Sequence, residues 1–127
     1  MKKTLFLALL MLSSQMAEAK QVTVQTKNMT MVLNVDEGKQ PQYVYFGAKL
    51  SDYDLAHLQA PRGGRMDAYP AYGMDCPAEA ALAMRHADGS LATELVATGV
   101  EQQDGVTRIH LKDTVYPVTV DLCYKGY

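Results

Sequence analysis

The feature that most constrains the fold is a series of short apolar segments separated by Asp-Gly turns. Asp104-Gly105 stands between the stretches 91–102 and 106–111, and Asp88-Gly89 follows a further stretch at 80–86. Asp-Gly between two extended segments is a strong short-range signal for a β-hairpin, because tight hairpin turns need residues that tolerate positive φ. Consecutive hairpins of this kind predict an all-β fold, an antiparallel β-sandwich.

The first half of the chain repeats the period of two. Val22 and Val24 alternate with polar residues. In the next predicted strand one face is formed by Met29, Met31, Leu33 and Val35, with Thr30 and Asn34 opposite. The cluster DEGKQP at 36–41 interrupts the pattern, and the aromatic stretch 43–46 reads as a further strand. The first half therefore predicts three more strands.

The last predicted strand, 116–124, alternates most cleanly. Its inward positions are Tyr116, Val118, Val120, Leu122 and Tyr124. Cys123 falls on the opposite and more polar face. We therefore expect Cys123 to lie outside the core.

One segment changes period and predicts a helix of one or two turns. Ser51, Asp52 and Asp54 offer oxygens for an N-cap, and Leu55 and Leu58 lie three residues apart on one face. Two neighbouring acids also suggest general acid and base chemistry. Capping and stabilisation of the helix dipole explain them more simply, so we interpret Asp52 and Asp54 as structural.

Residues 1–19 have the pattern of a secretory signal peptide. Lys2 and Lys3 precede the apolar run 5–12, and Ala17-Glu18-Ala19 forms a small-x-small cleavage site. The apolar run is too short to span a bilayer, so no membrane attachment is expected after cleavage. The sequence predicts an exported protein, periplasmic or extracellular, with a mature domain at 20–127.

The mature segment has 108 residues, enough for one small domain with a single core. It carries ten Lys and Arg against thirteen Asp and Glu, a net charge of −3. Without a basic excess to neutralise phosphates, nucleic acid is not an expected partner. Cys76 and Cys123 can pair in an oxidising compartment, and the sequence leaves their pairing open.

No motif for catalysis or metal binding stands out. His57, His86 and His110 are too scattered for a metal-binding motif, and Gly63-Gly64 lacks the Lys and helix start of a phosphate-binding loop. We therefore predict no catalytic residue, no metal ligand and no cofactor.

The stretch Arg62–Pro77 is long for a connection in a small domain and combines Tyr, Arg and Asp with Gly and Pro. Tyr rings can stack on a sugar ring, and Arg and Asp can bind its hydroxyls. The simpler interpretation is a loop that packs against a neighbouring domain or covers the edge of the sandwich. The candidate substrate-binding residues in it are Tyr72 and Asp75.

Four phrases of the chain resemble landmarks of the N-terminal domain of glycoside hydrolase family 36, the α-galactosidases, and occur in the family's order. They are YVYFGAKLSD at 43–52, AYPAYGMD at 68–75, AALAMRHADGS at 80–90 and TRIHLKDTVYPVTVDLCY at 107–124. The resemblance covers nearly the whole mature segment. It implies a β-supersandwich that packs against a catalytic (β/α)8 barrel, in enzymes that remove terminal α-linked galactose with retention.

Two departures limit what carries over from that family. Met74-Asp75-Cys76 stands where the family has a Gly-Asp-Phe-Arg phrase, so only Asp75 matches. The family's nucleophile lies in a Lys-x-Asp phrase of the barrel, whereas Lys112 and Asp113 are adjacent here. No catalytic residue is therefore assigned to this chain.

The resulting expectation is a partial N-terminal β-sandwich domain at 20–127, a non-catalytic fragment of an exported α-galactosidase that is inactive alone. Its expected partners are the catalytic barrel, absent here, and galactosides. The alternative is a free-standing secreted β-sandwich that binds carbohydrate through the Arg62–Pro77 loop.

Overall fold

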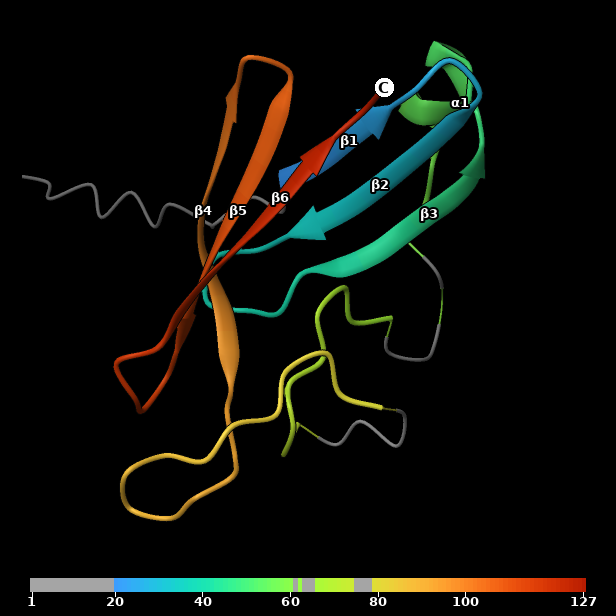
Figure 1. Cartoon of the computed structure of the whole chain (residues 1–127). Helices are drawn as coiled ribbons and strands as arrows, with labels where there is room; N and C mark the ends of the chain where they lie inside the picture. The colour runs from blue at the N-terminus through green and yellow to red at the C-terminus, as the bar shows by residue number, and fades with distance from the viewer. Residues whose placement is uncertain (1–19, 61, 63–65, 75–78) are drawn as a thin grey trace, which may run out of the picture.

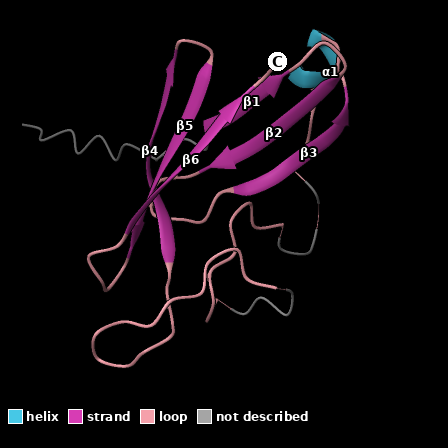
Figure 2. Ribbon diagram, in the orientation of Figure 1, coloured by secondary structure: helices cyan, strands magenta, loops and turns pink. Residues whose placement is uncertain are grey.

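The structure, a computed structural model, describes residues 20–60, 62, 66–74 and 79–127. This part of the chain holds six strands and one short helix (Figures 1 and 2). In chain order they are β1 (Lys20–Gln25), β2 (Met29–Val35), β3 (Gln42–Ala48), α1 (Asp52–Ala56), β4 (Leu95–Gln103), β5 (Val106–Asp113) and β6 (Thr119–Lys125). The all-β prediction with one short helix is confirmed.

The strands form two antiparallel sheets of three, in the orders β1-β2-β3 and β4-β5-β6. Figure 1 shows the blue-green first sheet and the orange-red second sheet inclined to one another, with β6 beside β1 in the view. Gly126, just after β6, approaches the carbonyl oxygen of Gln25 so closely that any Cβ there would collide with it. The end of the second sheet thus meets the end of the first.

One core lies between the two sheets. Leu33 of β2, Leu95 of β4 and Ile109 of β5 are at most 1% exposed and belong to the same cluster. Tyr124 of β6 packs near Tyr43 of β3, and burial together with this neighbour raises the pKa of Tyr124 to about 12. Because apolar residues of both sheets share this cluster, the predicted sandwich is confirmed.

The predicted Asp104-Gly105 hairpin joins β4 to β5. Asp104 has φ +53° and Gly105 has φ +74°, the positive values that a two-residue turn of this type needs. The register runs without a break from Gln103↔Val106 to Gly99↔His110, where a bulge follows.

The acidic residues before Leu55 cap α1, as the sequence predicts. The Ser51 side chain accepts a hydrogen bond from the Asp54 backbone N–H at 3.2 Å, and Asp54 Oδ2 accepts one from the Ser51 backbone N–H at 3.4 Å. This reciprocal capping box, with Asp52 in the first turn, accounts for these carboxylates without catalytic chemistry.

The prediction of a strand at 80–86 is wrong. The segment forms only an isolated bridge, Ala71↔Leu82, and is otherwise irregular. Exposure does alternate along it, but its hydrogen bonds go to a loop, such as Ala81 N–H to Pro70 O at 2.8 Å. The alternating sequence correctly predicts that one face of this segment is less exposed than the other. A strand, however, also needs a neighbouring strand to pair with. Asp88-Gly89 is a turn, with Gly89 at φ +87°, but it joins no hairpin.

Two other predicted strands begin later than expected. Regular pairing of β4 starts at Leu95 instead of residue 91, and β6 starts at Thr119 instead of Tyr116. Pro117 cannot donate a ladder hydrogen bond, so the start of the predicted last strand becomes part of the β5–β6 connection. The inward set of β6 is confirmed for Val120, Leu122 and Tyr124, which join the core.

The predicted signal peptide, residues 1–19, lies outside the described residues. In the part that is described, no helix has the length and apolar character needed to cross a membrane.

Candidate functional site

The two residues predicted to bind substrate belong to one loop, of which the structure describes a part. Tyr72 is 53% exposed, and Asp75 lies outside the described residues. The Tyr72 backbone donates to Leu82 O at 2.9 Å and accepts from Thr93 N–H at 3.0 Å. The described part of this loop is therefore attached to the irregular segment that precedes β4.

A hollow of about 390 Å³ lies next to the part of this loop that follows Tyr72, at the end of the sandwich where the β5–β6 connection meets that irregular segment. In Figure 1 these are the red and the yellow-orange segments at the bottom of the view. Gly73 and Met74 contribute one wall. The polar groups that line the hollow come from Gln40, Ser90, Thr93, Glu94, Asp113, Thr114 and Tyr116.

Asp113, the last residue of β5, holds this end together. Its side chain accepts backbone hydrogen bonds from Glu94 N–H at 2.7 Å, Val115 N–H at 2.8 Å and Tyr116 N–H at 2.6 Å. Burial opposes the charge of this carboxylate, but the three backbone donors together with His86 prevail and lower its pKa. Asp113 is therefore an ionised structural carboxylate.

An aromatic stack forms the other support of the hollow. The His86 and Tyr116 rings lie parallel, with centroids 3.5 Å apart and 7° between their planes. The buried His86 places Nε2 at 3.0 Å from Thr93 Oγ1, and Tyr116 donates its hydroxyl proton to Asp88 Oδ2 at 2.8 Å. The backbone N–H of Ser90 and then the Tyr116 hydroxyl lower the pKa of Asp88.

Two carboxylates, Glu94 and Asp113, line the same hollow, which raises the question of glycoside hydrolysis. A retaining glycosidase uses one carboxyl group with a raised pKa as the acid and a second as the nucleophile. Asp113 has a lowered pKa and both its oxygens accept backbone hydrogen bonds. Asp113 is therefore unsuited to the acid role, and its oxygens are already occupied by backbone donors. We interpret the proximity of Glu94 and Asp113 as structural.

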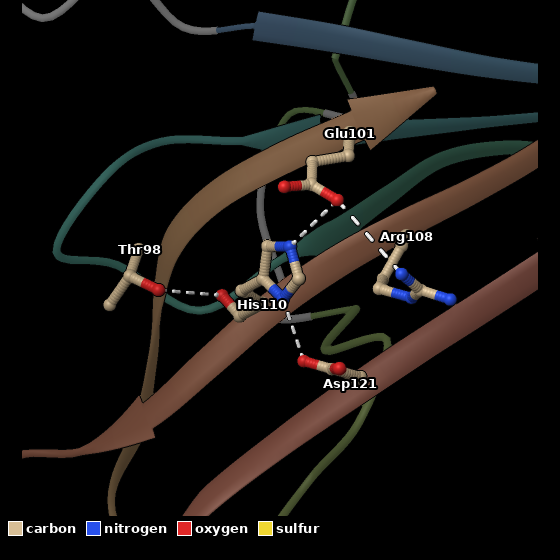
Figure 3. Close-up of polar contacts among 5 residues, drawn as sticks. All are labelled: Thr98, Glu101, Arg108, His110 and Asp121. Carbon is tan, nitrogen blue, oxygen red and sulfur yellow. Dashed lines mark hydrogen bonds and ion pairs between the residues drawn. The ribbon is translucent and has the colours of Figure 1, made fainter. Parts of the chain in front are cut away.

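A second polar cluster lies on the outer face of the second sheet (Figure 3). His110 of β5 stands between two carboxylates, with Nδ1 at 2.7 Å from Asp121 Oδ1 and Nε2 at 3.6 Å from Glu101 Oε2. Arg108 Nη1 lies 3.9 Å from Glu101 Oε2. Thr98 donates its hydroxyl proton to the His110 carbonyl oxygen at 3.3 Å.

This cluster is open to solvent. The hydrogen bond to Asp121 is the largest cause of a raised pKa at His110, and the charge of Glu101 adds to it. Half-exposed ion pairs of this kind contribute little to stability. The alternation that places Cys123 on the polar face places Asp121 there too. It does not pair Asp121 with His110, because that pairing depends on the register between β5 and β6.

Cys123 lies on the same face, exposed and with a free thiol, as its position in the alternation predicts. Cys76 lies outside the described residues. In the described ranges, no three His, Cys, Asp or Glu side chains gather as a metal site.

Comparison with known proteins identified a family and a similar solved structure. A family model described as the glycosyl hydrolase family 36 N-terminal domain matches residues 39–127. The crystal structure of the α-galactosidase from Lactobacillus brevis resembles this fold with a TM-score of 0.61 and 15% sequence identity, over 84% of this chain and 19% of that chain. The chain thus spans about a fifth of the length of that protein. A search of curated protein sequences found no match.

Proposed function

Because the chain belongs to the glycosyl hydrolase family 36 N-terminal domain family, we propose that it is the non-catalytic N-terminal module of an exported α-galactosidase. In this proposal the whole enzyme hydrolyses terminal α-galactosides, and a (β/α)8 barrel outside this chain performs the chemistry. The family match over 39–127 carries the proposal.

The chemistry of the described residues favours a non-catalytic role for this module. Retaining hydrolysis needs two carboxyl groups about 5 Å apart on either side of the scissile bond. The carboxylates that come together here serve other purposes: Asp113 caps backbone donors, and Asp54 caps a helix.

Uncovered apolar surface supports a packing role. Phe46 of β3 is 67% exposed and Met66 is 51% exposed, and both line a shallow hollow of about 450 Å³ with Tyr43, Val44 and Tyr45. Apolar surface of this kind is typical of protein contacts. We propose that the catalytic domain covers it.

Export is proposed from the signal-like residues 1–19, with cleavage after Ala19. The protein would then reach the periplasm or the medium with Lys20 as its first residue.

The alternative is a free-standing secreted module that binds carbohydrate. One observation favours it, the polar hollow lined by Gly73 and Met74 of the Arg62–Pro77 loop.

Two measurements test the proposal. The purified chain is incubated with p-nitrophenyl α-galactopyranoside, and we expect no release of nitrophenol above the buffer rate. Hydrolysis by the chain alone would refute the non-catalytic role. N-terminal sequencing of the protein recovered outside the cytoplasm is expected to begin at Lys20, and an intact Met1 on the natural protein would refute export with cleavage.

A further inference from the structure

We propose that the hollow at the end of the sandwich binds one ring of a neutral polyol, the chemical class to which hexopyranoses belong. Its volume of about 390 Å³ falls within the roughly 300–1,000 Å³ of small-molecule sites. The loop at 73–74, the segment 90–94 and the β5–β6 connection at 113–116 form its walls.

The aromatic wall is held rigidly before any ligand arrives. Tyr116 stacks on His86 at 3.5 Å, donates its hydroxyl proton to Asp88 and donates its backbone N–H to Asp113. The segment 86–88 therefore fixes the ring, and Asp113 fixes the backbone that carries it. A ring that is already immobilised loses no side-chain entropy on binding and can pack against the C–H face of a saturated ring.

The polar wall offers both donors and acceptors. Glu94 supplies a carboxylate, which accepts the Thr114 hydroxyl proton at 3.2 Å, and Ser90 supplies a hydroxyl group, whose oxygen accepts the Ala92 backbone N–H at 3.3 Å. Each hydroxyl of a polyol donates one hydrogen bond and accepts others, so a mixed wall of this kind matches it.

Other ligand classes fit less well. The negative charges of Glu94 and Asp113 disfavour an anion. A purely apolar ligand would remove water from these polar groups without replacing its hydrogen bonds. A neutral polyol satisfies both conditions.

Binding in this hollow would be a property of this chain itself and does not depend on attachment to a catalytic domain. A failure to bind would therefore leave the proposed non-catalytic role untouched. The expected contacts are on Glu94 and Tyr116, whereas the sequence pointed to Tyr72 and Asp75.

The test is an NMR titration of the ¹⁵N-labelled full chain with methyl α-D-galactopyranoside, methyl α-D-glucopyranoside and myo-inositol. We expect saturable shifts, with a dissociation constant of about 1–10 mM for at least one of them, centred on the amides of 90–94 and 113–116. Glu94→Gln is expected to weaken binding 5- to 10-fold, and Tyr116→Leu more than 10-fold.

Glu101→Gln serves as the control, because it makes the same change on the outer face of β4 and is expected to bind as the unmodified chain does. Tyr116→Phe keeps the ring but loses the hydroxyl bond to Asp88, so it is expected to weaken binding less than Tyr116→Leu does. Since Glu94 is exposed, its substitution tests the site even where Tyr116→Leu fails to fold. Unsaturated or absent shifts up to about 50 mM, shifts centred elsewhere, or normal binding by Glu94→Gln would overturn the proposal.

Discussion

Asp113→Asn is the substitution that tests most sharply how the end of the sandwich is held together. The Asp113 side chain is 2% exposed and accepts three backbone hydrogen bonds, two on Oδ1 and one on Oδ2. Asparagine replaces one acceptor oxygen by an N–H₂ group, which then faces a backbone donor. The variant therefore loses at least one hydrogen bond and leaves a buried donor without an acceptor.

A hydrogen bond to a charged group contributes about 1.5–3 kcal/mol, and an orphaned buried donor adds its desolvation cost. We expect Asp113→Asn to lower the free energy of unfolding by about 2–4 kcal/mol, and the Tm by about 10–20 °C. Urea unfolding of the chain, followed by far-UV circular dichroism, measures the difference directly.

The pH dependence of this difference has a definite sign. Asp113 has a lowered pKa in the folded state, so its contribution is present above the pKa of the unfolded chain, about 3.9. It disappears as the pH falls through the folded-state pKa. The gap between the two proteins is therefore complete at pH 7 and shrinks below about pH 4.

Asp121→Asn is the matched control, because it makes the same change at a half-exposed carboxylate paired with His110. We expect a loss below about 1 kcal/mol. Equal losses from the two substitutions would refute the role assigned to Asp113.

Three further predictions address other parts of the fold. Ile109→Ala empties a fully buried position in the shared core and should cost about 2–5 kcal/mol in urea unfolding, whereas an unchanged midpoint would mean that the sheets do not share this core. Gly105→Ala should cost only about 1 kcal/mol, because the added methyl meets nothing within 4 Å and strains only the positive φ; a cost of several kcal/mol would contradict this description of the turn. The pKa of His110, measured by NMR, should lie above its ordinary value and should fall in Asp121→Asn. The contribution of His110 to stability is then complete below about pH 6.5 and is lost as the pH rises through the folded-state pKa. An unshifted titration would rule out the ion pair in solution.

Much of the fold could be predicted from the sequence because local signals mark where the strands and the helix begin and end. Asp104-Gly105 predicted a hairpin, and Ser51 marked the start of a helix. The alternation identified core positions at 31, 33 and 35 and at 120, 122 and 124. Each of these signals is local. Each expresses a conformational preference that survives in the folded chain.

The failures occurred where structure depends on distant partners. The segment 80–86 alternates like a strand, but no strand lies beside it, so it binds the loop at 70–72. Tyr116 continued the apolar pattern of β6, yet it leaves the sheet before Pro117 and stacks on His86. Pro117 is a local signal that β6 starts late, but neither the partner of 80–86 nor the stack of Tyr116 on His86 has a signal within a few residues.

The candidate site shows the same limit. Tyr72 was named from its chemical type in a long loop and is exposed, whereas Glu94 and Asp113 attracted no attention as a pair. They meet in one hollow because β5 and the segment before β4 end at the same place. Only the register between β4 and β5 brings them there.

The measurement that tests the central claim most directly is immunopurification of the natural protein from its own cells, with an antibody raised against residues 20–127. The bound material is assayed with p-nitrophenyl α-galactopyranoside and with the matching β-galactoside as the control substrate. The account predicts α-galactosidase activity that co-purifies with this segment and is depleted from the remaining extract. Quantitative recovery of the protein with all α-galactosidase activity left in the extract would contradict it.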